Sequence, residues 1–272
     1  MDLLAIARRL EAIQAEVVRQ LASDSEPVAG GWMAANGPGS YLNKAVALGF
    51  DGEPTDEDVV RVERFFASRG IEPKVELTQF APVPFLRRLA ERGFVLQEFE
   101  NTLVLPLQGL PRPRTLLPGG WPEGVRIERV DPRDERQVDV FVRTSASGFI
   151  PDGEEISEEY LRTGARAARA TEHDSYLAYV GKEVAGAGGC GTRHGVTSLF
   201  GTSVLPRFRR RGIQQALMAV RLERALELGS ELSDITSHPG IPTERNAGRL
   251  GYRLAFVRPV LVKRAPGLVP SP

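Results

Sequence analysis

The sequence predicts an α/β protein built from two related halves, and three observations support this prediction. Segments whose apolar residues recur at helical spacing alternate along the chain with short segments of alternating apolar and polar residues, which is typical of α/β folds. A proline-rich segment lies near the middle of the chain. The parts on its two sides align with each other, without a gap, at an offset of 158 residues.

The composition of the 272 residues is that of an ordinary globular protein. Lysine plus arginine and aspartate plus glutamate number 35 each, so no global field attracts the chain to nucleic acid or to an anionic membrane. The single cysteine, Cys190, cannot form an internal disulfide and supplies no cluster of metal ligands. We therefore expect a reducing compartment, the cytoplasm by default, and no metal site.

Residues 1–21 predict an amphipathic helix of a soluble protein. Apolar residues follow helical spacing there, but Arg8, Arg9 and Glu11 interrupt them. A signal peptide needs an uninterrupted apolar stretch. A helix that spans a bilayer needs roughly 18 to 20 apolar residues. We expect neither, and no membrane partner.

The proline-rich segment predicts a linker between two domains. Proline fixes φ and lacks an N–H group, so a continuous helix or strand is improbable where prolines 106, 111, 113, 118 and 122 crowd together. We expect one domain over 1–107, a linker over 108–122 and a second domain over 123–264. Residues 265–272, which contain proline and glycine, are expected to form a flexible tail.

Identical residues recur at the offset of 158 in both halves. The matched pairs include Thr78 and Thr236, Pro84 and Pro242, Arg87 and Arg245, Gly93 and Gly251, Leu96 and Leu254, Leu103 and Leu261, and Val104 and Val262. In each half an apolar run leads to a proline-containing turn, a short helix, a glycine and an alternating strand. A tandem duplication accounts for this order; chance similarity of two α/β units is the alternative.

The pattern of apolar residues in the second half predicts the order of its strands and helices. Apolar alternation predicts strands over 125–130, 175–180, 183–192, 196–205, 232–237 and 252–263. Helical spacing predicts helices over 134–147 and 154–170, and another that begins near Ile213 and ends at Gly229.

One segment, residues 199–217, predicts a phosphate-binding site. A strand ends at a proline, a basic loop follows, and a glycine opens an amphipathic helix. The unpaired N–H groups of a helix's first turn and its positive dipole end attract anions. Gly212 lacks a Cβ, so a pyrophosphate can approach the backbone, and Arg209, Arg210 and Arg211 add positive charge. The alternative is a solvated basic turn or a nucleic-acid patch.

The arrangement resembles the cofactor motif of the GNAT N-acetyltransferase superfamily, in which Val-x-Pro ends a strand and Arg/Gln-x-x-Gly-x-Gly/Ala opens a helix. The matching residues here are Val204-Leu-Pro206, the aromatic Phe208, and Arg209-Arg-Arg-Gly212-Ile-Gln214. The resemblance covers the second half in the order of its elements and the first half more faintly. It implies two GNAT-like domains in tandem, each a mixed, largely antiparallel sheet flanked by helices, and acetyl-CoA as the cofactor.

The resemblance also implies a set of cofactor contacts. Backbone groups of Thr202, Ser203 and Val204 would pair with pantetheine. The pyrophosphate would be held by Arg209, Arg210, Arg211, Gly212, Ile213, Gln214 and Gln215. Asn246, near the start of the final helix, would bond to the cofactor or cap that helix. Gln214 replaces the usual glycine or alanine, which is tolerable if its side chain points outward.

Acidic residues occupy the first half at the positions that correspond to the basic loop. They are Asp51, Glu53, Asp56, Glu57 and Asp58. Carboxylates would repel a pyrophosphate. We therefore expect only the second half to bind the cofactor, with the first half as a structural partner.

The usual catalytic groups of the family are absent from their positions. The strand over 196–205 carries no carboxylate, and Ala247 stands where many members have a tyrosine that protonates the leaving thiolate. His238, just beyond the next strand, is the expected catalytic base because histidine titrates near neutral pH. A surface histidine without a catalytic role is the alternative.

The sequence thus predicts direct transfer of an acetyl group from acetyl-CoA to a primary amine of a small molecule or peptide. A non-catalytic acetyl-CoA-binding module is the alternative that Ala247 and the missing carboxylate favour. A nucleic-acid-binding protein using residues 207–211 is disfavoured by the neutral net charge, so no nucleic acid is expected as a partner. The oligomeric state is open, and a monomer is compatible with two halves that imitate a family dimer.

Overall fold

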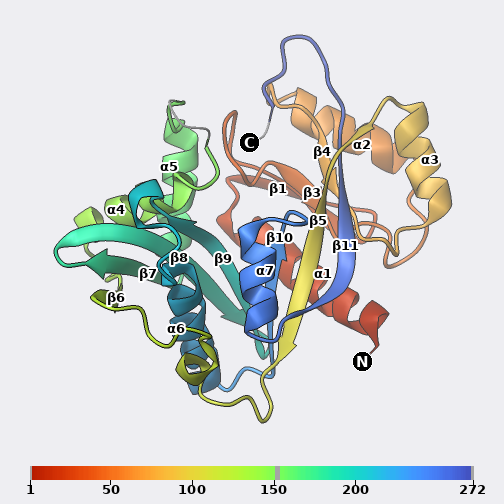
Figure 1. Cartoon of the computed structure of the whole chain (residues 1–272). Helices are drawn as coiled ribbons and strands as arrows, with labels where there is room; N and C mark the ends of the chain where they lie inside the picture. The colour runs from red at the N-terminus through yellow and green to blue at the C-terminus, as the bar shows by residue number, and fades with distance from the viewer. Residues whose placement is uncertain (1, 151–153, 271–272) are drawn as a thin grey trace. The chain divides into compact units, whose positions relative to one another are not determined.

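The computed structural model describes residues 2–150 and 154–270, which form two compact units (Figure 1). Unit 1 comprises residues 1–101, 157–163 and 255–272, and unit 2 comprises 102–156 and 164–254. No helix among the described residues is long and apolar enough to cross a membrane.

Unit 1 contains a mixed sheet with the strand order β1-β2-β3-β4-β11-β5. Strand β2 pairs antiparallel with both β1 and β3, β3 pairs parallel with β4, and β4 pairs antiparallel with β11. The elements are α1 (Leu3–Leu21), β1 (Asp24–Val28), β2 (Gly31–Ala35), β3 (Lys44–Val46), α2 (Asp56–Ala67), β4 (Lys74–Glu76), α3 (Val83–Glu91), β5 (Val95–Pro106) and β11 (Arg253–Val262).

The expected amino-terminal helix is α1. Asp2 caps it by accepting hydrogen bonds from the backbone N–H groups of Leu4 and Ala5 at 3.0 and 3.2 Å. Its apolar face is buried, as the spacing of Leu10 and Val18 indicates.

Unit 2 contains strands in the order β5-β10-β9-β8-β7-β6. Strand β10 pairs parallel with β9, and the pairs β9–β8, β8–β7 and β7–β6 are antiparallel. The elements are η1 (Pro113–Leu116), β6 (Val125–Arg129), α4 (Glu135–Ala146), α5 (Glu158–Ala168), β7 (His173–Val180), β8 (Glu183–Arg193), β9 (Val196–Val204), η2 (Pro206–Phe208), α6 (Ile213–Glu227), β10 (Leu232–Ser237) and α7 (Pro242–Arg249).

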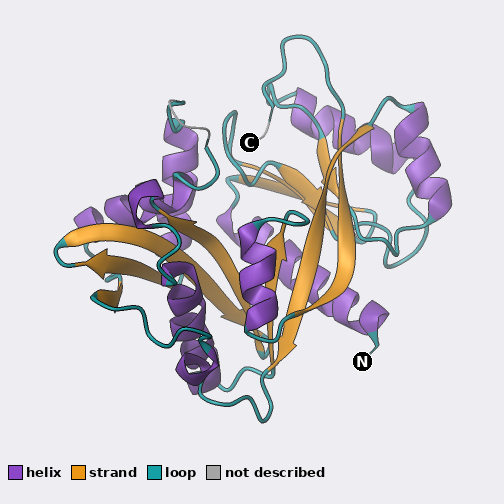
Figure 2. Cartoon of the chain, in the orientation of Figure 1, coloured by secondary structure: helices purple, strands orange, loops and turns teal. Residues whose placement is uncertain are grey.

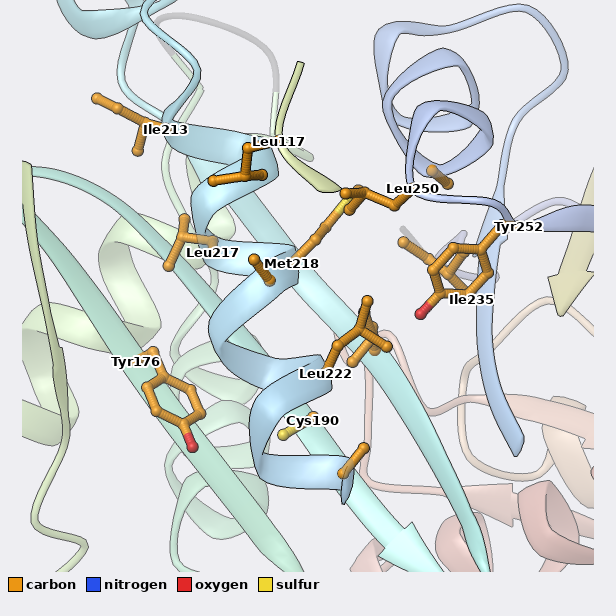
Figure 3. Close-up of a cluster of buried hydrophobic side chains, with 14 of the residues drawn as sticks. Leu117, Tyr176, Cys190, Ile213, Leu217, Met218, Leu222, Ile235, Leu250 and Tyr252 are labelled. Carbon is orange, nitrogen blue, oxygen red and sulfur yellow. The ribbon is translucent and has the colours of Figure 1, made fainter. Parts of the chain in front are cut away.

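Helix α6 forms the centre of the core of unit 2. Figure 2 shows it in front of strands β7, β8 and β9, with α4 behind them. Leu217, Met218 and Leu222 are completely buried. Figure 3 shows these side chains on α6, with Tyr176 and Cys190 on the strands beneath it. Burial raises the pKa of the Cys190 thiol to about 12, so this cysteine packs in the core as an uncharged thiol.

The internal repeat is visible in the structure. Strand β4 begins at Lys74 and β10 at Leu232, 158 residues later. Strand β5 begins at Val95 and β11 at Arg253, at the same offset. Helices α2 and α6 begin at Asp56 and Ile213, which are 157 residues apart, within one residue of the same offset. The two halves therefore follow the same order of elements over this stretch.

The structure departs from the sequence-based expectations at one helix start and adds detail to two segments. Helix α5 begins at Glu158 rather than at Glu154, because the Ser157 Oγ accepts from the N–H of Tyr160 at 3.1 Å and caps the helix there. The proline-rich segment contains η1, and the tail pairs through Val269 with Ile71. Strands β5 and β11 and helix α5 each divide between the units. The division into separate domains at 108–122 stays a prediction.

We expect the substitution Leu217→Ala to destabilise unit 2 by about 2–5 kcal/mol, because it removes a completely buried side chain from the face of α6 that packs on the sheet. Leu228→Ala is the matched control at the end of the same helix, where the side chain is 44% exposed. Urea unfolding followed by far-ultraviolet circular dichroism measures both. Equal midpoints for the two variants would contradict the assigned core.

Candidate functional site

Strands β9 and β10 separate from each other in the middle of unit 2. They pair in parallel from Val196 and Leu232 as far as Leu199 and Ile235. Beyond that pair, β9 continues to Val204 and β10 to Ser237 without further pairing between them. Every backbone N–H and C=O group needs a partner, so the separated ends leave backbone groups available to a ligand.

A β-bulge lies in β9 at the level where the strands separate. Ala187 of β8 pairs with Ser203, whereas Gly189 pairs with Phe200, so Gly201 and Thr202 together face the single residue Gly188. Gly201 has φ +57°, and a Cβ on it would lie 2.7 Å from the Ser145 Oγ. Both the left-handed backbone and the close approach of α4 therefore require glycine at this position.

Helix α6 begins at an N-terminus that no side chain caps. Gly212 is the N-cap residue, with φ +76° in the left-handed region. The first backbone hydrogen bond of the helix runs from the N–H of Ala216 to the carbonyl of Gly212 at 3.0 Å. The N–H groups of Ile213, Gln214 and Gln215 precede it and have no acceptor within the helix. This is the geometry of an anion site.

The arginines of the preceding loop differ in their contacts. Arg207 forms an ion pair with Glu183 at 2.6 Å, and the Nε of Arg209 donates to the carbonyl of Val204 at 3.1 Å. Arg210 and Arg211 are exposed and make no ion pair with any residue that the structure describes. Arg210 also has φ +63°, which is uncommon for a residue other than glycine and clusters at functional sites. Two cations are thus left to bind an anion.

The polar side chains at the start of α6 contact α7. The Nε2 of Gln214 donates to the Oγ1 of Thr243 at 2.8 Å, and its Oε1 accepts from the Nδ2 of Asn246 at 2.6 Å. The Nε2 of Gln215 donates to the Oδ1 of Asn246 at 3.2 Å. Gln214 therefore directs its side chain at α7 and leaves its backbone N–H at the helix start. Asn246 lies inside α7, whose N-cap is Ile241.

His238 follows the last residue of β10 and is exposed. It therefore lies one residue beyond the end of the strand that borders the separation. Sequence reasoning missed Asp234 of β10, which accepts from the Ser198 Oγ at 2.6 Å beside the last paired residues of β9 and β10. A polar residue inside an otherwise apolar strand was the available signal.

The residue at the position of the usual acid and the aromatic residue after the final glycine are both buried. Ala247 is fully buried in α7. Tyr252, after the final glycine, lies in the core with its hydroxyl 2.7 Å from the Ser233 Oγ. Burial raises the pKa of Tyr252 well above its ordinary value. Tyr252 therefore packs in the core.

The corresponding helix of unit 1, α2, has a capped N-terminus. Thr55 accepts from the N–H of Asp58 at 3.2 Å, and the carboxylate of Asp58 accepts from the N–H of Thr55 at 2.8 Å, which forms a capping box. The first turn carries three carboxylates, on Asp56, Glu57 and Asp58. The chain's own carboxylates thus hold the place that an anionic ligand would need.

Comparisons with known proteins agree with this geometry. Residues 141–251 match the family model described as acetyltransferase (GNAT) family. A comparison with curated proteins gives no match.

Solved structures share the fold over most of the chain. A GCN5-related N-acetyltransferase from Kribbella flavida superposes with a TM-score of 0.70 and 17% identity, covering 96% of each chain. A tandem GNAT protein from the clavulanic acid biosynthesis pathway superposes with a TM-score of 0.60 and 13% identity, covering 90% of this chain and 84% of its own. The prediction of an α/β fold with GNAT-like units in tandem is confirmed, and residues 141–251 match the family model of the GNAT acetyltransferases.

Proposed function

We propose that this protein is an N-acetyltransferase that moves an acetyl group from acetyl-CoA directly to a primary amine of a small molecule or peptide. One observation carries the proposal. Unit 2 combines an uncapped, glycine-initiated helix with two parallel strands that separate beside a bulge. The first feature suits a pyrophosphate, and the second suits the pantetheine arm and its acyl group.

The donors and charges of unit 2 suit coenzyme A. The N–H groups that open α6 and the guanidinium groups of Arg210 and Arg211 would bind the pyrophosphate. Gly212 presents no Cβ on that side. The backbone of Thr202, Ser203 and Val204 would pair with pantetheine, and Asn246 would contact the arm from α7. Acetyl-CoA, when bound, supplies an activated acetyl thioester.

The chain's own groups would then assist the transfer in two ways. A backbone N–H within residues 200–204 would donate to the thioester carbonyl and stabilise negative charge there. The acceptor amine must lose its proton before it attacks, and His238 beside the separated strands would accept that proton, directly or through water. With Ala247 in place of tyrosine, water would protonate the departing thiolate.

A non-catalytic acetyl-CoA-binding module is the second candidate. The buried Ala247 and the absence of a carboxylate from β9 favour it. Release of the coenzyme A thiol, measured against a panel of amines, separates it from the enzyme. A nucleic-acid-binding role loses support because Arg207 and Arg209 are engaged within the protein.

We expect Gly212→Asp to weaken acetyl-CoA binding by several kcal/mol, since two like charges near 4 Å repel by about 4 kcal/mol at an effective dielectric near 20. Gly212→Asn is the matched control, because asparagine has nearly the same shape, tolerates a left-handed backbone and carries no charge. Isothermal titration calorimetry measures both variants after circular dichroism shows that they are folded. Equal affinities for the two variants would place the pyrophosphate elsewhere.

We expect one acetyl-CoA per chain, bound to unit 2. The reason is that the N-terminus of α6 is uncapped, whereas that of α2 is closed by Thr55 and Asp58. Calorimetric stoichiometry on the full chain tests this expectation. A stoichiometry of two, or a single site that survives Gly212→Asp and disappears when Asp58 is mutated, would contradict it.

We expect His238→Ala to lower turnover by roughly 10²- to 10⁴-fold and to leave acetyl-CoA affinity nearly unchanged, as for removal of a general base. The measurement needs an acceptor that the amine panel has identified. His194→Asn is the control: His194 lies with positive φ in the turn between β8 and β9, a conformation that asparagine accepts. Full turnover by His238→Ala would make His238 a surface residue, with Asp234 the next candidate for the base.

A further inference from the structure

Helix α6 carries an arginine that is completely buried. Arg221 has no exposed surface and lies four positions after Leu217, on the buried face of the helix. No carboxylate of the described residues pairs with it. Burial accordingly lowers the pKa of its guanidinium from the ordinary value.

The guanidinium of Arg221 contacts the two strands beside the bulge. Its Nη1 donates to the carbonyl of Gly189 in β8 at 2.8 Å and to the carbonyl of Phe200 in β9 at 3.2 Å. Its Nε donates to the carbonyl of Leu217 in its own helix at 2.9 Å. Gly189 and Phe200 are the pair at which the register changes. One cation therefore joins the last regular pair before the bulge to α6.

The neighbouring glycine makes room for this cation. A Cβ on Gly188 would lie 2.9 Å from the Cζ of Arg221. Gly188 is also the residue that the two bulged residues of β9 face. A glycine in β8 opposite the bulge therefore leaves space for the guanidinium of Arg221.

Helix α4 holds the bulge by separate contacts. The Ser145 Oγ donates to the carbonyl of Gly201 at 2.8 Å. The hydroxyls of Ser147 and Ser203 lie 3.1 Å apart. Successive carbonyls of β9, at Phe200 and Gly201, are therefore held by α6 and by α4 respectively. With both carbonyls occupied, the peptide groups of the bulge have little freedom to rotate.

Burying a cation without a counter-ion opposes stability, and apolar side chains of similar volume often replace buried charges without loss. The arginine is therefore poorly explained as a packing residue. A bulge interrupts the ladder of hydrogen bonds between β8 and β9. The N–H groups of Arg221 instead supply hydrogen bonds to these strands at that place. This role fixes the direction of the peptide groups at residues 200–202.

We propose that Arg221 is a positioning residue that holds the β9 bulge in the orientation in which a backbone N–H of β9 reaches the carbonyl of the acyl donor. The identity of the acyl donor rests on the proposed function, whereas the part that Arg221 plays at the bulge rests on its contacts with β8 and β9. It assigns no contact between Arg221 and a substrate.

The first test uses the free protein and Arg221→Met, which keeps the length of the side chain and removes its donors. We expect amide hydrogen exchange in residues 199–203 to become at least roughly tenfold faster, while the melting temperature stays equal or rises. Arg224→Met is the matched control on the same helix, because Arg224 pairs with Asp174 away from the bulge. Unchanged exchange in Arg221→Met would overturn the proposal whatever the protein binds.

The second test compares acetyl-CoA with coenzyme A and records the infrared carbonyl band of bound acetyl-CoA labelled with ¹³C at the carbonyl. We expect the wild type to lower the frequency of this band, because a hydrogen bond weakens the C=O bond. In Arg221→Met the band should return toward its position in water, and the preference for acetyl-CoA over coenzyme A should fall roughly three- to tenfold. Arg224→Met should behave like the wild type, and Arg221→Lys should restore part of the shift.

The outcomes distinguish this inference from the proposed function. If wild type binds acetyl-CoA with a shifted band and Arg221→Met keeps the same shift, the positioning role is wrong and the proposed cofactor stands. If wild type does not bind acetyl-CoA, the proposed function and this inference both fail. Should Arg221→Met not fold, Ser145→Ala removes the opposing contact, and the same loss of band shift is expected from it.

Discussion

The candidate cofactor site of this protein depends on the separation of β9 from β10. In a regular parallel sheet each strand uses the N–H and C=O groups of its neighbour, and nothing remains for a ligand. Here the Ser198–Asp234 hydrogen bond lies beside the last paired residues, Leu199 and Ile235. Beyond them the backbone of β9 is free of β10 but is still held by β8. The proposed pantetheine contacts and the proposed carbonyl contact both require that state.

Helix α6 connects this separation to the rest of unit 2. Its first residue follows a left-handed glycine at the candidate anion site, and its apolar face packs in the core. Its polar start contacts α7 through Gln214, and its third turn carries Arg221 to the bulge. A shift of the helix along its axis would therefore disturb all three features together. This coupling explains why core packing and ligand geometry in this unit are not independent.

The sequence predicted what depends on local pattern. The basic loop, Gly212 and the helical spacing that follows are contiguous, so the sequence predicted the start of α6 directly, and it is there that the anion site is proposed. The bulge could not be predicted, because the conformation of Gly201 follows from the pairing of β8 with β9 and from the approach of Ser145. Arg221 stands four residues after Leu217, on the buried face of the helix. A charged residue is ordinarily predicted to be exposed to solvent, so the sequence pattern does not indicate its burial. The direction of the Gln214 side chain was likewise set by α7, a tertiary neighbour.

The two halves show how a few residues at a helix start decide whether its first backbone N–H groups are capped or left open. Both α2 and α6 follow a strand and a turn, and their first residues are 157 positions apart, close to the offset of 158 at which the two halves align. In α2, Thr55 and Asp58 satisfy each other's backbone N–H groups, and the first-turn carboxylates already interact favourably with the helix dipole. That arrangement stabilises the helix without a ligand. In α6 no side chain satisfies the first N–H groups, so the helix start remains less stable until an anion occupies it. Capping and ligand binding compete for the same backbone N–H donors. The first half has residues that cap its helix, and the second half leaves the donors of its helix open.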